Sequence, residues 1–226
     1  MNIIDRAKRV FEHGKEPTQT CIFCHPIPER VLFETDHFRV LIDTYPIVPG
    51  HLLISTKSHY GNAGELPDSL KEEFLQIKKE VKSIALQINS STIFYEHGKA
   101  GSCHSSSPEE IVCEHFHFHC LPIVQCIHHE IAKKFTPISL STDADFFAHG
   151  ERMGSYLYFE NSWGTAKIYP AGPRQVPPHF LRTLICQSLQ IGELAEWQAY
   201  NRFDRYLNSL QTILDAFQPE DQNALS

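Results

Sequence analysis

The sequence predicts an α+β fold: an antiparallel sheet with flanking helices, followed by a mixed C-terminal extension. Two observations support this prediction. Short β-rich segments between residues 31 and 56 follow one another with turns between them, as in an antiparallel meander. A long amphipathic segment at 67–89 then separates them from strand-like segments at 91–96 and 113–122. Strands on both sides of one long helix are typical of α+β proteins.

The elements before the long helix are an opening helix and three strands. Apolar residues at helical spacing predict a helix over 3–13, which the following glycine ends. VLFET at 31–35 and FRVLID at 38–43 are predicted strands. A turn with two prolines and a glycine then leads into a third strand, HLLIST at 51–56.

The long segment 67–89 carries a stripe of apolar residues with Lys and Glu elsewhere, which predicts a helix with one solvated face. The character of the sequence changes after about residue 128. We therefore expect one domain at 1–127 and a C-terminal extension at 128–226 that packs on it. The extension has two predicted strands, YLYFE at 156–160 and AKIYP at 166–170, and predicted helices near 178–190 and 198–217.

Composition and charge limit the possible functions. A net charge of -7 gives no basic field to hold a long nucleic acid, although local donors can still bind a small anion. No run approaches the roughly 18 apolar residues of a membrane span, and the charged N-terminus does not resemble a signal peptide. We therefore expect a cytoplasmic protein with no membrane partner. Seven cysteines, an odd number, favour reduced thiols over a complete disulfide framework.

The segment CEHFHFHCLP places His115, His117 and His119 at every second position. In a strand, these three imidazoles share one face, and the phenylalanines take the other. Residues two apart advance about 6.6 Å, so the outer two histidines lie about 13 Å apart. We therefore expect three separate roles rather than one three-ligand cage. The alternative is a polar sheet face that happens to be rich in histidine.

The chemistry expected of His117 is nucleophilic. A neutral imidazole attacks phosphorus well, and water can resolve the product, if a carbonyl or another histidine fixes the tautomer. His119, on the same face, can donate to a phosphate oxygen or assist the leaving group. Two alternatives stay open: a buried, hydrogen-bonded histidine pair, and a catalytic zinc held by the histidines.

Three further groups of polar residues have predicted positions. Cys21 and Cys24 can share one tetrahedral zinc if two ligands come from elsewhere, and they can equally be a redox pair or buried thiols. Asp43 follows a strand, where its carboxylate can bind both hydroxyls of a ribose or cap the turn. The histidines that fit no pattern are expected at the surface: His128, His129, His149 and His179.

DTYPIVPGHLLISTKSH is followed by a mainly helical stretch of about 35 residues, a strand, a glycine-containing loop and then HFHFHCLP. Together these segments resemble the histidine triad family over roughly residues 20–125. The resemblance implies an antiparallel sheet with flanking helices, assembled as a homodimer. It also implies hydrolase or transferase activity on the α-phosphate of a nucleotide, with His117 as nucleophile, His119 on the phosphate and Asp43 on the ribose. Members with C-x-x-C bind structural zinc, and their ligands match Cys21, Cys24, His59 and His115.

The sequence departs from the small family members at two places. Glu96 stands where they have an amide, and Glu110, Ile111 and Val112 replace their Gly-Gln-Ser or Gly-Gln-Thr group. A carboxylate beside a phosphate repels it, so Glu96 is either turned away or acts as an acid or base. Substrate contacts are then expected from the enlarged loop, at Gly98, Gly101 and Ser102. The rival hypothesis is a zinc-stabilised nucleotide-binding protein without turnover.

Overall fold

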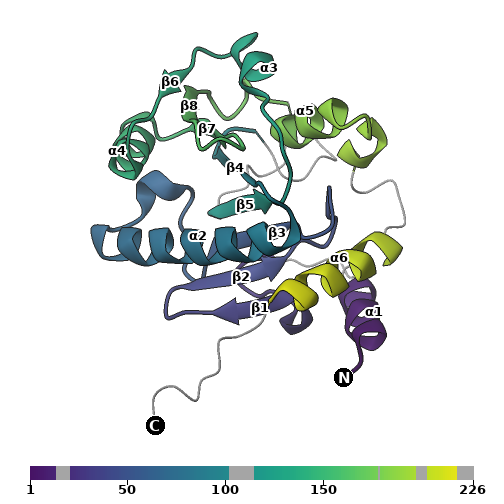
Figure 1. Cartoon of the computed structure of the whole chain (residues 1–226). Coiled ribbons are helices and arrows are strands. Elements are labelled where there is room, and N and C mark those ends of the chain that lie inside the picture. The colour runs from purple at the N-terminus through teal and green to yellow at the C-terminus, as the bar shows by residue number, and fades with distance from the viewer. Residues whose placement is uncertain (14–20, 102–114, 178, 197–202, 218–226) are drawn as a thin grey trace.

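The structure is a computed structural model, and it describes residues 1–13, 21–101, 115–177, 179–196 and 203–217. Its centre is one eight-stranded antiparallel sheet with the order β1-β2-β3-β5-β4-β7-β8-β6 (Figure 1). The α+β class and the antiparallel sheet are therefore confirmed. The strands are β1 (Val31–Glu34), β2 (Phe38–Ile42), β3 (Leu52–Thr56), β4 (Ile93–Gly98), β5 (His117–Leu121), β6 (Ile138–Ser139), β7 (Tyr156–Glu160) and β8 (Ala166–Pro170).

Helices cover both faces of the sheet. The α-helices are α1 (Ile3–His13), α2 (Asp68–Ile88), α3 (His128–Ala132), α4 (Asp143–Met153), α5 (Phe180–Ser188) and α6 (Phe203–Ala216), and short 3-10 turns lie at Pro28–Arg30, Ala63–Glu65 and Gly192–Ala195. The long helix α2 packs its buried stripe on one face, together with α1, α4 and α6. The helices α3 and α5 pack on the other face. Alternation along the strands, such as Phe118 on one face and Leu121 on the other, supplies both apolar clusters.

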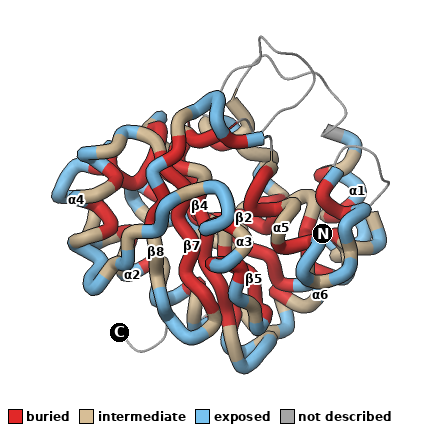
Figure 2. The backbone as a smooth tube through the Cα atoms, turned by 90° about the horizontal axis from the view of Figure 1, so that it is seen from above, coloured by how far each residue is buried: buried red, intermediate tan, exposed pale blue. Residues whose placement is uncertain are grey.

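Strands from before and after residue 127 belong to the same sheet. β7 pairs with β4 over five residue pairs, from Phe94↔Glu160 to Gly98↔Tyr156. The first and last helices that the structure describes also meet, because Phe11 of α1 makes an edge contact with Tyr206 of α6 at 5.7 Å (Figure 1). Figure 2 shows the central strands as a buried layer. No helix of the described residues is long and apolar enough to cross a membrane.

The extension differs from the sequence-based expectations in several details, since α3, β6 and α4 were not predicted and one histidine is buried. The helix α4 was not predicted; it begins with a capping box in which Thr142 and Asp145 exchange hydrogen bonds, and it ends at Gly154 with φ of 68°. The prediction of His128 at the surface was wrong. Its ring is buried, with Nδ1 against the Tyr169 hydroxyl at 2.8 Å and Nε2 against the Thr165 carbonyl at 3.0 Å.

Candidate functional site

The triad face of the sheet carries two apolar clusters with the histidines between them. On one side lies the cluster of α3 and α5, and on the other lie Phe23, Leu41 and Leu53. His117 and His119 point to this face because Phe118 between them packs under α2. The period-two arrangement predicted from the sequence thus holds for the strand β5. His115 lies just before the strand and completes the group.

The predicted metal ligands Cys21, Cys24, His59 and His115 meet at one point. Their ligand atoms all lie within 4.8 Å of one another, although the residues are up to 94 positions apart in the sequence. The individual separations from sulfur to Nδ1 are 3.4 Å for Cys21–His115, 3.5 Å for Cys24–His115 and 3.2 Å for Cys24–His59. A zinc ion with tetrahedral bonds of about 2.3 Å to sulfur and about 2.1 Å to nitrogen holds its ligand atoms about 3.5 Å apart, which matches the observed separations.

The tautomer of His115 also suits a metal ligand. Its Nε2 lies 2.8 Å from the Thr56 carbonyl oxygen, which only accepts, so the ring proton is on Nε2. The lone pair of Nδ1 therefore faces the two sulfur atoms, and a backbone carbonyl holds the ring in this orientation. Two thiols and two imidazoles in a closed group are the donor set of a structural zinc site.

The hydrogen bond at Nδ1 sets the tautomer of His117. Its Nδ1 donates to the carbonyl oxygen of His115 at 2.8 Å, and a carbonyl cannot donate in return. The proton is therefore on Nδ1, and the lone pair is on Nε2. Phe23, from the loop between the two cysteines, stacks on the His117 ring at 4.6 Å with an interplanar angle of 17°. His117 is buried, with 6% of its surface exposed.

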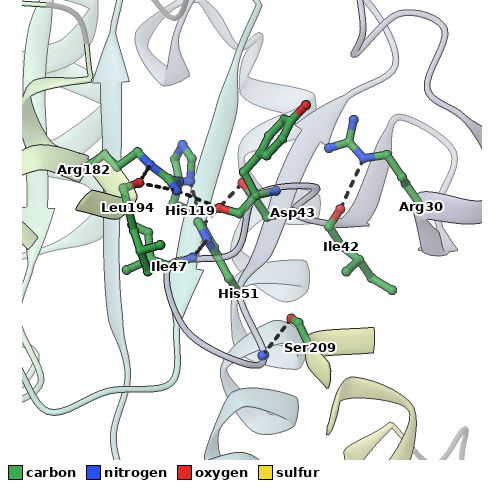
Figure 3. Close-up of polar contacts among 11 residues, drawn as sticks. Arg30, Ile42, Asp43, Ile47, His51, His119, Arg182, Leu194 and Ser209 are labelled. Carbon is green, nitrogen blue, oxygen red and sulfur yellow. Dashed lines mark hydrogen bonds and ion pairs between the residues drawn. The ribbon is translucent and has the colours of Figure 1, made fainter. Parts of the chain in front are cut away.

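His119 belongs to a second hydrogen-bonded group, with His51 and Asp43 (Figure 3). The His51 Nδ1 accepts from the Ile47 amide at 3.4 Å, so the ring proton of neutral His51 is on Nε2. This Nε2 lies 2.9 Å from the His119 Nδ1 and 3.8 Å from the Asp43 Oδ2. Neutral His119 therefore accepts at Nδ1 and carries its proton on Nε2. Tyr95 stacks on its ring at 4.1 Å.

Burial and nearby positive charges lower the pKa values of His51, His97 and His119, so these three rings are uncharged at neutral pH. Burial lowers the pKa of His51 to about 4, despite the opposing Asp43 carboxylate. Burial also holds the pKa of His119 well below its usual range, and the nearby histidines and Arg182 add to this. His97 on β4 has a pKa lowered to about 3, mainly by burial, and its Nε2 accepts from the Leu181 amide at 3.1 Å.

Asp43 lies at the end of β2, where its carboxylate caps the following turn. Its Oδ1 accepts from the Tyr45 amide at 2.6 Å, which is the turn-capping bond considered from the sequence. The pKa of the carboxyl is lowered: His51, Arg182, Arg30 and the Tyr45 amide outweigh the opposing effect of burial. Asp43 is therefore ionised and placed next to His51 at neutral pH.

Glu96 is turned away from the triad. It lies on β4 one residue after Tyr95, so its side chain points to the α2 face of the sheet. There it accepts from the Ala63 amide at 3.1 Å and from the Tyr156 hydroxyl at 2.8 Å. Burial raises the pKa of this carboxyl to about 8, although both hydrogen bonds and His117 oppose the shift.

The substitution Glu96→Gln is expected to stabilise the protein at alkaline pH. The folded-state pKa of about 8 lies above the ordinary 4.5, so the folded protein retains a proton that the unfolded chain releases between these values. Stability from this group is present below pH 4.5 and is lost as pH rises to 8. Urea unfolding should show the variant more stable than the parent at pH 9 and similar to it at pH 5; equal stability at pH 9 contradicts the assignment.

Sequence reasoning did not single out His51 as a functional residue, and its role is testable. The substitution His51→Leu removes the donor to His119 Nδ1 and is expected to lower kcat by about 10²-fold with little change in KM. His51→Gln keeps an N–H near the position of Nε2 and should restore part of the rate. Steady-state kinetics of the two variants check this; equal rates in both would show that the hydrogen bond is not used.

The predicted substrate-binding glycines Gly98 and Gly101 have close neighbours in the C-terminal extension. A Cβ at Gly98 would lie 2.5 Å from the Tyr156 ring, so glycine is required where β4 meets β7. Gly101 has φ of 83°, and its amide donates to the Pro173 carbonyl at 3.1 Å. The structure thus joins both glycines to the extension. The third predicted contact, Ser102, lies outside the described residues.

Sequence comparison identifies a known domain in the first half of the chain. The HIT domain family model matches residues 25–125. An uncharacterized HIT-like protein of Methanocaldococcus jannaschii is 31% identical over 108 residues, which are 45% of this chain and 78% of that protein. A second uncharacterized HIT-like protein, of Saccharolobus solfataricus, is 26% identical over 114 residues, which are 45% of this chain and 73% of that protein.

Two solved structures show the range of the structural similarity. A hypothetical histidine triad nucleotide-binding protein from Sulfolobus tokodaii has 23% identity and a TM-score of 0.35, covering 45% of this chain and 68% of that one. The yeast Ap4A phosphorylase in complex with Ap4A has 13% identity and a TM-score of 0.46, covering 74% and 79%. The sequence matches carry the assignment: the chain belongs to the histidine triad (HIT) family.

Proposed function

We propose that this protein is a hydrolase or transferase that attacks the α-phosphate of a nucleotide conjugate through a covalent nucleotidyl-histidine intermediate. The conjugate is a dinucleoside polyphosphate, a nucleotidyl sugar or a phosphoramidate. The observation that carries the proposal is the hydrogen bond from His117 Nδ1 to the His115 carbonyl, which places the ring proton on Nδ1 and makes Nε2 the nucleophilic atom of the neutral ring.

The reaction has two displacements. In the first, the Nε2 lone pair of His117 forms a bond to the α-phosphorus, and the bond from phosphorus to the leaving group breaks with its electron pair. The leaving group takes up a proton. In the second, water or another acceptor attacks the same phosphorus and loses a proton, and the bond to Nε2 breaks. Splitting one difficult displacement into two lowers the barrier of each.

His119, His51 and Asp43 assist both steps. Because His51 donates to Nδ1 of His119, the Nε2–H of His119 is the group available to a phosphate oxygen or to the leaving group. Charge that develops on these oxygens is stabilised by a donor that is already in place. In this proposal, the Asp43 carboxylate accepts hydrogen bonds from ribose hydroxyls while its other oxygen caps the turn.

We also propose that Cys21, Cys24, His59 and His115 hold a structural zinc ion. A four-ligand site of this kind has no open position for water, so zinc supplies rigidity there rather than catalysis. The three triad histidines have different partners, which supports this division: His115 faces the cysteines, His117 a carbonyl and His119 another histidine. A homodimer and a cytoplasmic location stay predictions from the family resemblance and the composition.

The covalent intermediate gives the direct test. The protein is mixed with α-labelled nucleotide conjugates from the three classes, quenched in alkali and digested. We expect label on the peptide that contains residue 117, because a nucleotidyl-histidine is stable to alkali. Turnover of a conjugate without label on this peptide, at times when the intermediate should be populated, would count against the covalent role.

A zinc-stabilised nucleotide-binding protein without turnover is the second candidate. The stacking of Phe23 on the buried His117 ring favours it, since an aromatic side chain occupies one side of the nucleophile. The substitution Phe23→Ala separates the two candidates. If the nucleotide binds but no member of the substrate panel is hydrolysed by either the parent or this variant, the binding function is the better description.

A further inference from the structure

Three side chains of the C-terminal extension bind the loop that joins β2 to β3. Arg182 of α5 donates through Nη2 to the Tyr45 carbonyl at 2.9 Å, and Arg205 of α6 donates to the Ile47 carbonyl at 2.7 Å. The amide of Gly50 donates to the Ser209 hydroxyl at 3.0 Å (Figure 3). All three side chains lie outside the matched HIT domain at 25–125.

This loop carries both partners of His119 at its ends. Asp43 precedes it and His51 follows it, and a hydrogen bond from the Asp43 amide to the His51 carbonyl at 3.1 Å closes it. Gly50 has φ of 87°, and a Cβ there would lie 2.7 Å from the Ile88 side chain. The loop is therefore tightly packed at Gly50, and side chains from both α5 and α6 hold it.

Arg182 is the member of this group that is both buried and charged. Only 6% of its surface is exposed, and it donates to neutral carbonyl oxygens: besides the bond to Tyr45, Nε and Nη2 donate to the Leu194 carbonyl, at 3.0 Å and 2.9 Å. Burying a guanidinium costs several kcal/mol unless its donors are satisfied and its charge is balanced. The positive charge of Arg182 contributes to the lowered pKa of the Asp43 carboxyl.

The charge acts on the histidine pair as well. Burial is the largest cause of the lowered pKa of His119 and of His51; Arg182 adds to it in both, and at His119 it follows the effects of the neighbouring histidines. Both rings then stay neutral, so a single proton is shared between the His51 Nε2 and the His119 Nδ1. The charged and titratable groups around His119 are His117 on β5, His97 on β4, His51 and Asp43 at the loop, and Arg182 on α5.

We propose that Arg182 is a positioning residue for the triad: it anchors the Asp43–His51 loop through Tyr45 and fixes a positive charge beside His119. It acts through His51 and His119 and does not touch the substrate. The extension thereby becomes part of the catalytic machinery of the HIT domain instead of a separate cover. This inference rests on the proposed function for its kinetic consequence, but its electrostatic consequence can be measured without turnover.

The experiment compares three variants of the full chain. Arg182→Gln removes the charge and keeps a short donor, Arg182→Lys keeps the charge and changes the hydrogen bonds, and Ser209→Ala removes a neutral bond to the same loop. Histidine side chains are labelled with ¹³C, and their signals, assigned with His119→Gln, are followed from pH 8 down to the lowest pH at which each protein is still folded. In parallel, kcat and KM are measured against pH with the substrate found by the panel.

We expect the pKa of His119 to be higher in Arg182→Gln than in the parent, in Arg182→Lys and in Ser209→Ala, while burial and the neighbouring histidines still lower it in all four proteins. We also expect Arg182→Gln to lower kcat by up to about 10²-fold with KM nearly unchanged, and Arg182→Lys to restore part of it. An unchanged His119 titration in a folded Arg182→Gln overturns the proposal. If that variant does not fold, the test uses Arg182→Lys. A His119 pKa raised above that of the parent in Arg182→Lys overturns the proposed role of the charge, and a kcat equal to that of the parent overturns the proposed anchoring role.

The proposed function and this inference fail in distinguishable ways. Loss of the covalent intermediate in the labelling test would remove the kinetic prediction, but the titration of His119 would still report the Arg182 charge. Conversely, a labelled His117 with an Arg182→Gln variant that keeps the parent titration and rate would leave the proposed function in place and overturn only the role of Arg182.

Discussion

The substitution His117→Ala is expected to reduce turnover by about 10⁴-fold or more while nucleotide binding is retained. Removing a nucleophile removes the covalent route itself, and effects of this size are usual when such a group is lost. Steady-state kinetics and equilibrium binding of a non-hydrolysable nucleotide measure the two quantities separately. Retention of binding shows that the variant is folded, so that the loss can be assigned to chemistry.

Two matched variants sharpen this result. His129→Ala removes an exposed histidine outside the site and should leave the rate unchanged. His117→Gly should recover part of the activity when free imidazole is added, because the added ring can bind in the space next to Phe23 and attack phosphorus itself. Full turnover by His117→Ala would show that the reaction does not pass through this residue.

Loss of the metal site is expected to have the largest effect on stability. The parent should bind about one zinc ion per chain, and Cys24→Ser should bind it much more weakly, with Tm lower by about 10 °C or more. The ligands join the loop at 21–24 to His59 and His115, so the metal ties together segments that are distant in the sequence. Elemental analysis and thermal unfolding of the purified proteins measure both effects.

Cys126→Ser is the control for this substitution. Cys126 is exposed and lies outside the four-ligand group, so its replacement should change neither zinc content nor Tm by a measurable amount. Chelation of zinc from the parent should lower Tm, and the molecules that are still folded should keep their rate. A rate that falls to zero on chelation with Tm unchanged would instead assign the metal to catalysis and contradict the structural role.

The sequence predicts most of this sheet because its signals are local. The strands at 156–160 and 166–170 have the predicted bounds, and the long helix is confirmed within one residue at each end. The helix α4 was missed because only part of its apolar stripe is present, although the capping box at Thr142 and the glycine at 154 mark both its ends. The burial of His128 depends on Tyr169, a partner that sequence reasoning cannot locate.

The candidate site could be predicted from the sequence only in part. Family spacing indicated that Cys21, Cys24, His59 and His115 would converge, and the fold brings their ligand atoms together. The contacts between His51 and His119, and between Arg182 and Tyr45, join segments 68 and 137 residues apart. No periodicity or motif of a single sequence contains such pairs. They were therefore accessible only from the three-dimensional structure.

The central claim, a covalent intermediate on His117, is tested most directly by the stereochemistry at phosphorus. A nucleotide conjugate that is chiral at its α-phosphorothioate is converted by the protein, and the configuration of the product is determined. Two in-line displacements, the first by the Nε2 of His117, invert phosphorus twice, so this account predicts overall retention. Overall inversion would mean a single direct displacement and would contradict the account.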